Sequence, residues 1–430
     1  QLREQYHFAV ADASEAAWSD PTGPQAIELC RHFLYGQSPE RALPHLLRAL
    51  EELHANYLFE KLVDLGRRAL EAGVPDDPRE RFRVLLRVSH ASFLTGDWKV
   101  QQEAVEELGR ISESLDDRVA RLDALLEQSL QKYTAAEYGE SLRLCRQALE
   151  IASELDDRHR MESAERNLGI ALSRQGRHDE ALVHHRRSLA LCEELGLDGA
   201  AAGAHNNIAM QLVNVEELDE AEAHYVKAIE LARSNGQLRW EANANANYGR
   251  IFFKRGDYAR AWEQAMRYRD LVRQIGDRRG EATSGVILCA LWKIFGAVEE
   301  IEHEIAHVTV EVEATRDNWL SAFVLNKRAW LALQRGDFAE ARRLLDEAIE
   351  LRRGMEDRES LALALSEAGA LAAEQGARER AVALLTEALS IEEAESDIRL
   401  SALCDLAVLE PDRVDEARKA LDASSDPGPV

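Results

Sequence analysis

The chain has 430 residues, a length that exceeds what one ordinary hydrophobic core accommodates, so it indicates several domains or an array of repeated units. Its net charge of −25 argues against binding to nucleic acid or to an anionic membrane surface, because both require basic protein surface. With only 9 prolines and an excess of Ala, Leu, Glu and Arg, the composition favours helices throughout.

The five cysteines are dispersed along the sequence and form no close pair. They are expected to be small core residues in a reducing compartment, namely Cys30, Cys145, Cys192, Cys289 and Cys404. No apolar run approaches the length of a membrane span, and no signal peptide opens the sequence. We therefore expect a cytoplasmic protein.

Residues 1–55 are predicted to form an N-terminal helical arm. Three helices are expected: one over residues 1–15, one that follows the next loop and ends at about Tyr35, and one that begins at Pro39. The Ser38 side chain is expected to cap the third helix. Residues 20–24 are expected to form the loop between the first two helices. Because the sequence opens at Gln1 within a predicted helix, it also predicts a fragment, the C-terminal part of a longer protein.

The rest of the sequence repeats with a constant period. The turn that begins at Gly96 returns at residues 136, 176, 216, 256, 296, 336 and 376, a spacing of 40 residues. Glycine at this place suits the left-handed backbone that ends a helix. Each turn lies between two amphipathic segments, and small residues recur at fixed places beside it, which lets the two helices approach closely.

One such helix pair cannot bury its apolar face alone, so the pattern predicts an all-α solenoid of stacked helix–turn–helix units. Eight to nine repeats are expected over residues 56–395, followed by capping helices over 396–423 and a disordered tail over 424–430. One repeat departs from the pattern, because Ile301 stands in its alanine column. Altered packing is expected there.

The segment Asn167-Leu168-Gly169, followed by Gly-Arg-His-Asp-Glu-Ala over residues 176–181, resembles the tetratricopeptide repeat family. The likeness extends over residues 56–410 and is to the variant with long repeats of 40 residues. It implies tetratricopeptide-like repeats wound into a right-handed superhelix, whose concave groove binds other polypeptide.

A second resemblance concerns the N-terminal arm. Residues 28–34 (ELCRHFL) and 40–49 (ERALPHLLRA) are similar to the junction where bacterial STAND-class signalling ATPases, or kinase–ATPase fusions, pass into their C-terminal repeat arm. This resemblance implies an effector domain in cis upstream of Gln1. The sequence itself contains no glycine-rich phosphate loop, and no cofactor is expected.

The residues expected to bind a partner lie on the first helix of each repeat. A residue two places before the recurring small residue points about 200° away from it, since a helix turns about 100° per residue, and this face is expected to line the groove. Successive repeats place Asn167, Asn207 and Asn247 there, and an amide both donates and accepts, so this ladder is expected to clamp a peptide main chain. The expected partner-binding residues are Asn167, Arg174, Asn207, Asn214, Asn243, Asn247, Arg250, Lys254, Lys327 and Trp330. They include cations and no acid, which indicates an acidic protein or peptide partner.

The segment from His303 to His307, His-Glu-Ile-Ala-His, is the one motif with catalytic character. Two histidines four apart on a helix can bind zinc, with Glu304 as the base. The repeat register, however, places Ile305 and Val308 in the buried stripe, which leaves both histidines facing solvent without a third ligand. We therefore predict no enzymatic activity and no metal site, with a zinc-dependent hydrolase as the alternative.

The sequence thus predicts a protein–protein interaction module that binds a peptide or partner protein in its concave groove. It is expected to be the sensor or regulatory arm of a larger bacterial signalling protein. A stand-alone adaptor or scaffold is the alternative, and the two differ in whether the native gene encodes further chain upstream of Gln1.

Overall fold

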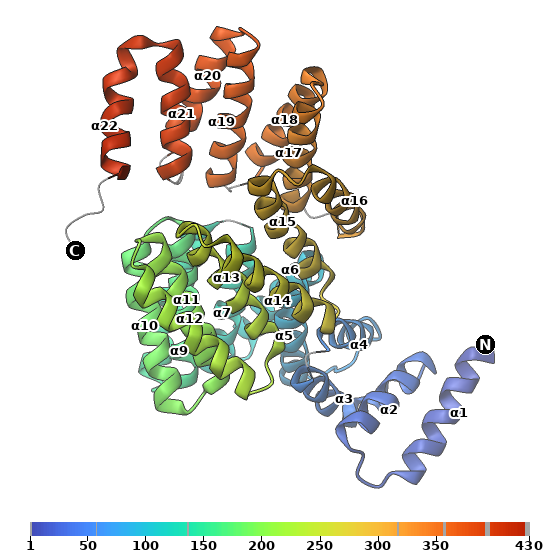
Figure 1. The fold of residues 1–430 in the computed structure, drawn as a ribbon. Coiled ribbons are helices and arrows are strands. Elements are labelled where there is room, and N and C mark those ends of the chain that lie inside the picture. Colours follow the sequence, from blue (N-terminus) through green and yellow to red (C-terminus); the bar gives the residue numbers. More distant parts are fainter. Residues whose placement is uncertain are drawn as a thin grey trace. The chain divides into compact units, whose positions relative to one another are not determined.

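The computed structural model describes residues 2–56, 58–135, 137–315, 318–355, 358–391 and 396–425. These residues form helices joined by short turns and contain no strand (Figure 1). The predicted all-α class is therefore confirmed. Within the same ranges, no helix combines the length and the apolar character that crossing a membrane requires.

The chain divides into two compact units, residues 1–215 and 216–430, in each of which consecutive helices pack against one another. The first unit contains α1 (Leu2–Ala17), α2 (Gly23–Tyr35), α3 (Pro39–Ala55), α4 (Phe59–Glu71), α5 (Pro78–Thr95), α6 (Trp98–Ser114), α7 (Arg118–Thr134), α8 (Tyr138–Glu154), α9 (Arg158–Arg174), α10 (His178–Leu195) and α11 (Asp198–Asn214). The second unit contains α12 (Leu218–Ser234), α13 (Leu238–Lys254), α14 (Tyr258–Gln274), α15 (Arg278–Phe295), α16 (Val298–Thr315), α17 (Asn318–Gln334), α18 (Phe338–Arg353), α19 (Arg358–Glu374), α20 (Arg378–Leu389), α21 (Ser396–Leu409), the 3-10 helix η1 (Pro411–Arg413) and α22 (Val414–Ser425).

Two series of turns repeat along the chain, and both use left-handed backbone. Within the repeats, the predicted glycine turns are confirmed, with φ between 67° and 75° at Gly96, Gly176, Gly256, Gly296, Gly336 and Gly376. In one repeat the equivalent residue is Glu216, which takes the same left-handed backbone with φ 65° although it is not a glycine. Between repeats lies a second series that the sequence analysis did not predict, at Asp116, Asp156, Gly196, Gly236 and Gly276.

Aspartates begin helices at both kinds of turn. In each case the side chain accepts a hydrogen bond from a backbone N–H of the first helical turn, at Asp97, Asp117, Asp157, Asp257, Asp277 and Asp337. A cap of this kind stabilises a helix by about 1 kcal/mol. The boundaries of the repeating helices therefore follow from residue types at fixed places in the sequence.

Small side chains let the paired helices approach closely. The predicted alanine column after the turn is buried, at Ala181, Ala221, Ala261, Ala341 and Ala381. Ile301, which replaces alanine in one repeat, is also fully buried and packs in a cluster with Cys289 and Val308. The larger side chain is therefore part of the core of its own repeat.

The N-terminal arm consists of the three predicted helices with shifted ends. α2 begins at Gly23, inside the predicted loop. Ser38 precedes α3, but its side chain makes no capping hydrogen bond, so that prediction was wrong. At the other end, α22 includes Ser424 and Ser425, the first residues of the predicted tail, and residues 426–430 lie outside the described part of the chain.

Four of the five cysteines are buried, as predicted, and carry no disulfide. Burial raises the pKa of the Cys30, Cys192 and Cys289 thiols to about 12, and that of Cys145 to about 11. Cys404 is exposed, so the prediction that it is a core residue was wrong. It lies on α21, close to the end of the described stack, where fewer neighbouring helices cover a side chain.

Gly169 of α9 lies directly against the ring of His185 of α10. A Cβ atom at Gly169 would lie 2.5 Å from both Cε1 and Nδ1 of the imidazole. His185 is buried, and its Nδ1 has no hydrogen-bond partner among the described residues. The glycine of the family-like motif therefore makes room for a histidine ring from the second helix of the same pair.

His185 is expected to make the chain less stable in mild acid. Burial, and then the charges of His184 and Arg166, lower the pKa of His185 from 6.5 to about 3. Below about pH 6.5 the unfolded chain takes up a proton that the folded chain does not accept, so stability is present above this pH and is lost as the pH falls toward 3. For this one group the loss at pH 5, relative to pH 7, is about 2 kcal/mol.

Denaturant-induced unfolding at the two pH values measures this loss. His185→Leu removes the titrating group. Between pH 7 and pH 5, the free energy of unfolding of this variant is therefore expected to fall by about 2 kcal/mol less than that of the wild type. His303→Leu replaces an exposed histidine and is the matched control. The same pH dependence in His185→Leu and the wild type would show that His185 does not carry the effect.

Candidate partner-binding faces

The first helices of successive repeats pack directly against one another. α3 contacts α5, α5 contacts α7, α7 contacts α9 and α9 contacts α11 in the first unit, and α15 contacts α17 in the second. Helices on the inner side of a solenoid have this arrangement. We call the side that carries the predicted binding residues the inner face of each unit. It comprises Asn167, Arg174, Asn207 and Asn214 in the first unit, and Asn243, Asn247, Arg250, Lys254, Lys327 and Trp330 in the second.

Asn167 is buried between helices of the first unit. Its side chain is 4% exposed, and Nδ2 donates a hydrogen bond to Ser129 Oγ of α7 at 3.3 Å, while Oδ1 has no partner among the described residues. A similar link occurs one repeat earlier, where Ser89 Oγ donates to Glu127 Oε2 at 2.6 Å. Glu127 and Asn167 both stand two places before the recurring small residue of their repeat, so at these two places that position joins neighbouring repeats. Asn207 is half-buried.

Arg174 and Asn214 are exposed on the inner face of the first unit. Arg174 Nε donates to the Tyr133 hydroxyl at 3.0 Å, and its guanidinium carbon lies 5.8 Å from the centre of that ring. His178 Nδ1 lies 2.9 Å from Gln211 Oε1 and 3.4 Å from Asn214 Nδ2. The sequence analysis missed Tyr133 and Gln211 as members of this face. Tyr133 stands 41 residues before Arg174, close to one repeat, and this spacing was the available signal. The 33 residues between His178 and Gln211 gave none.

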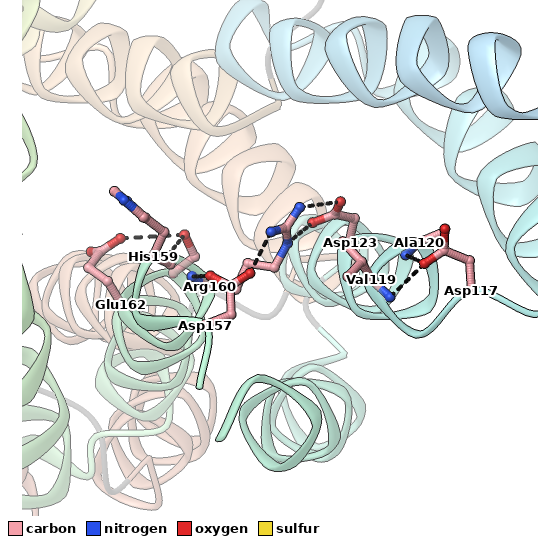
Figure 2. Close-up of polar contacts among 9 residues, drawn as sticks. Asp117, Val119, Ala120, Asp123, Asp157, His159, Arg160 and Glu162 are labelled. Atoms are coloured by element: carbon pink, nitrogen blue, oxygen red, sulfur yellow. Dashed lines mark hydrogen bonds and ion pairs between the residues drawn. The ribbon is translucent and has the colours of Figure 1, made fainter. Parts of the chain in front are cut away.

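Figure 2 shows how charged side chains join α7 to α9. Arg160 donates from Nε and Nη2 to the two carboxylate oxygens of Asp123 at 2.6 and 2.8 Å, and from Nη1 to Asp157 at 2.6 Å. The hydrogen bonds to Asp123 are the main reason why the pKa of Arg160 is raised. Burial alone would raise the pKa of Asp157, but its hydrogen bonds from Arg160 outweigh burial and lower it. Asp123 occupies the place equivalent to Asn243 three repeats later, and its charge is balanced by Arg160.

Three of the first helices of the second unit, α13, α15 and α17, contain few carboxylates. Among the residues of α13, α15 and α17, only Glu241 and Glu281 are acidic, in a chain with 78 acidic residues. Glu241 is buried and accepts hydrogen bonds from Arg233 and Arg267, each at 2.9 Å, which lower its pKa although burial opposes this. Glu281 accepts from Arg273 at 2.8 Å. Both carboxylates are therefore paired with arginines of the adjoining helices α12 and α14.

Four cations of these helices, Arg250, Lys254, Lys293 and Lys327, lie on or beside the inner face. Lys254 is exposed, while Arg250 and Lys327 are half-buried. The Nζ atom of Lys327 lies 5.1 Å from the ring centre of Phe323. Desolvation lowers the pKa of Lys327, while the charge of Glu367 acts in the opposite direction. Lys293, which the sequence analysis did not select, is exposed and lies 3.8 Å from Glu367.

The other predicted residues of the second unit differ in accessibility. Asn243 is exposed and Asn247 is half-buried. Trp330 is half-buried and packs against the apolar cluster of α15, α16 and α17. Asn243 is therefore the predicted amide of this unit that is most open to a partner.

The His303–His307 motif does not fit a zinc-dependent hydrolase. His303 and His307 are exposed, and Ile305 is buried, as the repeat register predicts. Glu304 is buried and accepts a hydrogen bond from Arg269 Nη1 at 3.2 Å, so this carboxylate is engaged where catalysis would need a base. Within the described ranges, no group of three or more His, Cys, Asp or Glu side chains is placed to hold a metal ion.

Three segments of the sequence match the tetratricopeptide repeat family. They are residues 124–194, which span α7 to α10, residues 202–235, which span α11 and α12, and residues 324–355, which span α17 and α18. These segments of the chain are tetratricopeptide repeats. No curated protein sequence matches the chain. The resemblance of its N-terminal arm to STAND-class proteins stays a prediction.

Solved structures of similar fold cover most of this chain. The apo form of the quorum sensor NprR from B. thuringiensis has a TM-score of 0.57 at 14% identity, with 81% of this chain and 97% of that chain covered. Aspartyl phosphate phosphatase F from Bacillus subtilis has a TM-score of 0.56 at 10% identity, with 82% and 94% covered. A Rap protein complexed with competence and sporulation factor has a TM-score of 0.54 at 15% identity, with 79% and 99% covered. These likenesses establish the fold and confirm the α-solenoid class.

Proposed function

We propose that this tetratricopeptide-repeat protein is a regulatory interaction protein that binds an acidic peptide, or an acidic segment of a partner protein, on the inner face of its second unit. The observation that carries the proposal is the charge of α13, α15 and α17. Their two carboxylates are paired with arginines, while Arg250, Lys254 and Lys293 lie on or beside the inner face. In a chain of net charge −25, such a local field attracts anionic partners and repels cationic ones.

Two structural neighbours support a role in sensing a factor. One is a quorum sensor, and another is a Rap protein complexed with competence and sporulation factor. By analogy we propose that this chain is the sensor or regulatory arm of a bacterial signalling protein. We also propose that it works in the reducing cytoplasm, which its unpaired cysteines suit. A stand-alone adaptor is the alternative, and a longer native gene with an effector domain upstream of Gln1 would favour the sensor arm.

Charge reversal on the inner face is expected to abolish binding of acidic peptide. A fluorescein-labelled peptide rich in Asp and Glu should bind the wild type at low salt, and its Lys- and Arg-rich counterpart should not. Replacing Arg250 and Lys254 with Glu is expected to weaken binding by about tenfold or more, because like charges then face each other. Fluorescence anisotropy at increasing salt measures both affinities.

The matched control is Lys99→Glu, which reverses an exposed lysine on α6 of the first unit. Equal weakening by Lys99→Glu, or equal binding of the basic peptide, would overturn the proposal. Replacing Asn243 and Asn247 with Ala tests main-chain clamping separately, because it leaves every charge in place. Retained binding in that variant would show that charge alone holds the peptide.

A further inference from the structure

Large apolar side chains are exposed where α13 and α15 end. Phe253 is 41% exposed, Ile294 is 42% exposed and Phe295 is 61% exposed. The ring of Tyr258, which begins α14, lies between the two phenylalanines, with ring centres 5.6 Å from Phe253 and 6.3 Å from Phe295, both edge-to-face. We call Phe253, Tyr258, Ile294 and Phe295 the aromatic edge. It joins three consecutive helices of the second unit.

The repeat register shows that the fold does not require apolar residues at positions 294 and 295. Forty residues before and after Ile294 stand Lys254 and Gln334, and the same steps from Phe295 lead to Arg255 and Arg335. Polar side chains thus serve at these places in the adjacent repeats. An exposed apolar patch where polar residues suffice indicates contact with another molecule.

The aromatic edge lies on a tightly packed base. Phe252, next to Phe253, is buried, and its ring centre lies 4.6 Å from that of Tyr248. The guanidinium carbon of Arg260 lies 4.4 Å from the centre of the same Phe252 ring. A surface supported in this way loses little conformational entropy when a ligand binds.

The charges beside the aromatic edge differ between its two sides. Lys254 and Lys293, both exposed, are sequence neighbours of Phe253 and Ile294, and Lys254 has no ion-pair partner among the described residues. On the side of the turns, Asp257 accepts from Arg260 at 2.6 Å, and Glu299 and Glu300 begin α16. A partner that covers the edge from the inner face therefore meets both lysines, with Glu367 of α19 as the carboxylate beside Lys293, while Asp257, Glu299 and Glu300 lie at the helix starts.

We propose that the aromatic edge anchors a bulky apolar side chain of the acidic segment that binds the inner face. The apolar side chain packs on Phe253, Ile294 and Phe295, and carboxylates beside it in the partner sequence pair with Lys254 and Lys293. This inference rests on the function proposed above and adds a sequence requirement, an aromatic or large aliphatic residue flanked by Asp or Glu. Apolar contact supplies affinity and the lysines select the acidic context.

The test compares two labelled acidic peptides that differ only in a central Phe or Ala. The full chain is expected to bind the Phe peptide about tenfold more tightly than the Ala peptide. Replacing Phe253 and Phe295 with Ala is expected to remove this difference. Phe295→Ser alone should reduce it, and this single change at a largely exposed side chain leaves folding intact. The control is Phe338→Ala, which replaces an aromatic residue of the same unit that is 47% exposed and lies outside the aromatic edge.

Three results would each overturn the inference: equal affinities of the two peptides, an unchanged difference in the Phe253 and Phe295 variants, or an equal loss in Phe338→Ala. Failure of the proposed function looks different, because then neither acidic peptide binds at concentrations up to about 1 mM. If both acidic peptides bind equally and charge reversal abolishes their binding, the proposed function stands and the anchor does not.

Discussion

Arg269→Ala is expected to lower the free energy of unfolding by about 3–5 kcal/mol, because it leaves a buried carboxylate without its partner. The guanidinium of Arg269 on α14 pairs with both carboxylate oxygens of Glu304 on α16, and its Nε donates to Ser284 Oγ on α15 at 2.9 Å. Both charged side chains are buried. Gly285 makes room for the pair, since a Cβ there would lie 2.5 Å from Glu304 Oε1. Denaturant unfolding of the full chain, followed by circular dichroism, measures the change.

Two variants show whether the loss comes from an unpaired buried charge. Arg343→Ala breaks exposed ion pairs to Glu340 and Glu347 on α18, so it should cost no more than about 1 kcal/mol. Replacing Arg269 with Met and Glu304 with Leu together removes both charges and should cost less than Arg269→Ala alone. An Arg269→Ala protein as stable as Arg343→Ala would refute this account.

Gly169→Ala is expected to destabilise the chain by about 1–3 kcal/mol, although alanine is the better helix former. The added Cβ would lie within 2.5 Å of the His185 ring, and the buried ring cannot move aside without disturbing the contact between α9 and α10. The overpacking outweighs the gain in helix propensity. The same denaturant measurement applies.

Gly139→Ala on α8 separates the two effects. A Cβ atom added at Gly139 would meet no packing neighbour within 4 Å among the described residues, so this change should be neutral or stabilising by up to about 1 kcal/mol. In a double-mutant cycle, Gly169→Ala combined with His185→Ala should cost less than the sum of the single changes, because the clash disappears. Additive losses would mean that the ring is not what excludes alanine.

The repeat and its turns could be predicted because they depend on local chemistry. Gly96 and its equivalents need left-handed backbone, and the alanine column needs small volume, so the residue type itself carries the signal. Cys404 and Ser38 escaped prediction for a different reason. Burial of a thiol and capping by a hydroxyl depend on neighbours and backbone angles that the residue type does not fix.

The candidate binding residues were harder to predict because they depend on how repeats pack. The rotation of the helix predicts that Asn167 points away from the small residue, but it does not predict which neighbouring helix Asn167 contacts. In the structure, Asn167 donates a hydrogen bond to Ser129 of α7. The accessible cations and amides, such as Lys254 and Asn243, followed from register alone. Phe253 and Phe295 did not, because an apolar residue near a helix end is typical of a core until the neighbouring helix ends are placed beside it.

The buried thiols allow local opening of the helices to be measured along this chain. An alkylating reagent reacts with thiolate, which is scarce and shielded while a thiol with a pKa near 12 stays inside the stack. Cys30, Cys145, Cys192 and Cys289 lie on α2, α8, α10 and α15, so the alkylation rate at each site reports how often that stretch of helices opens. Of the five cysteines, Cys404 alone is exposed in the folded chain. Its rapid modification therefore sets the reference rate for the other four.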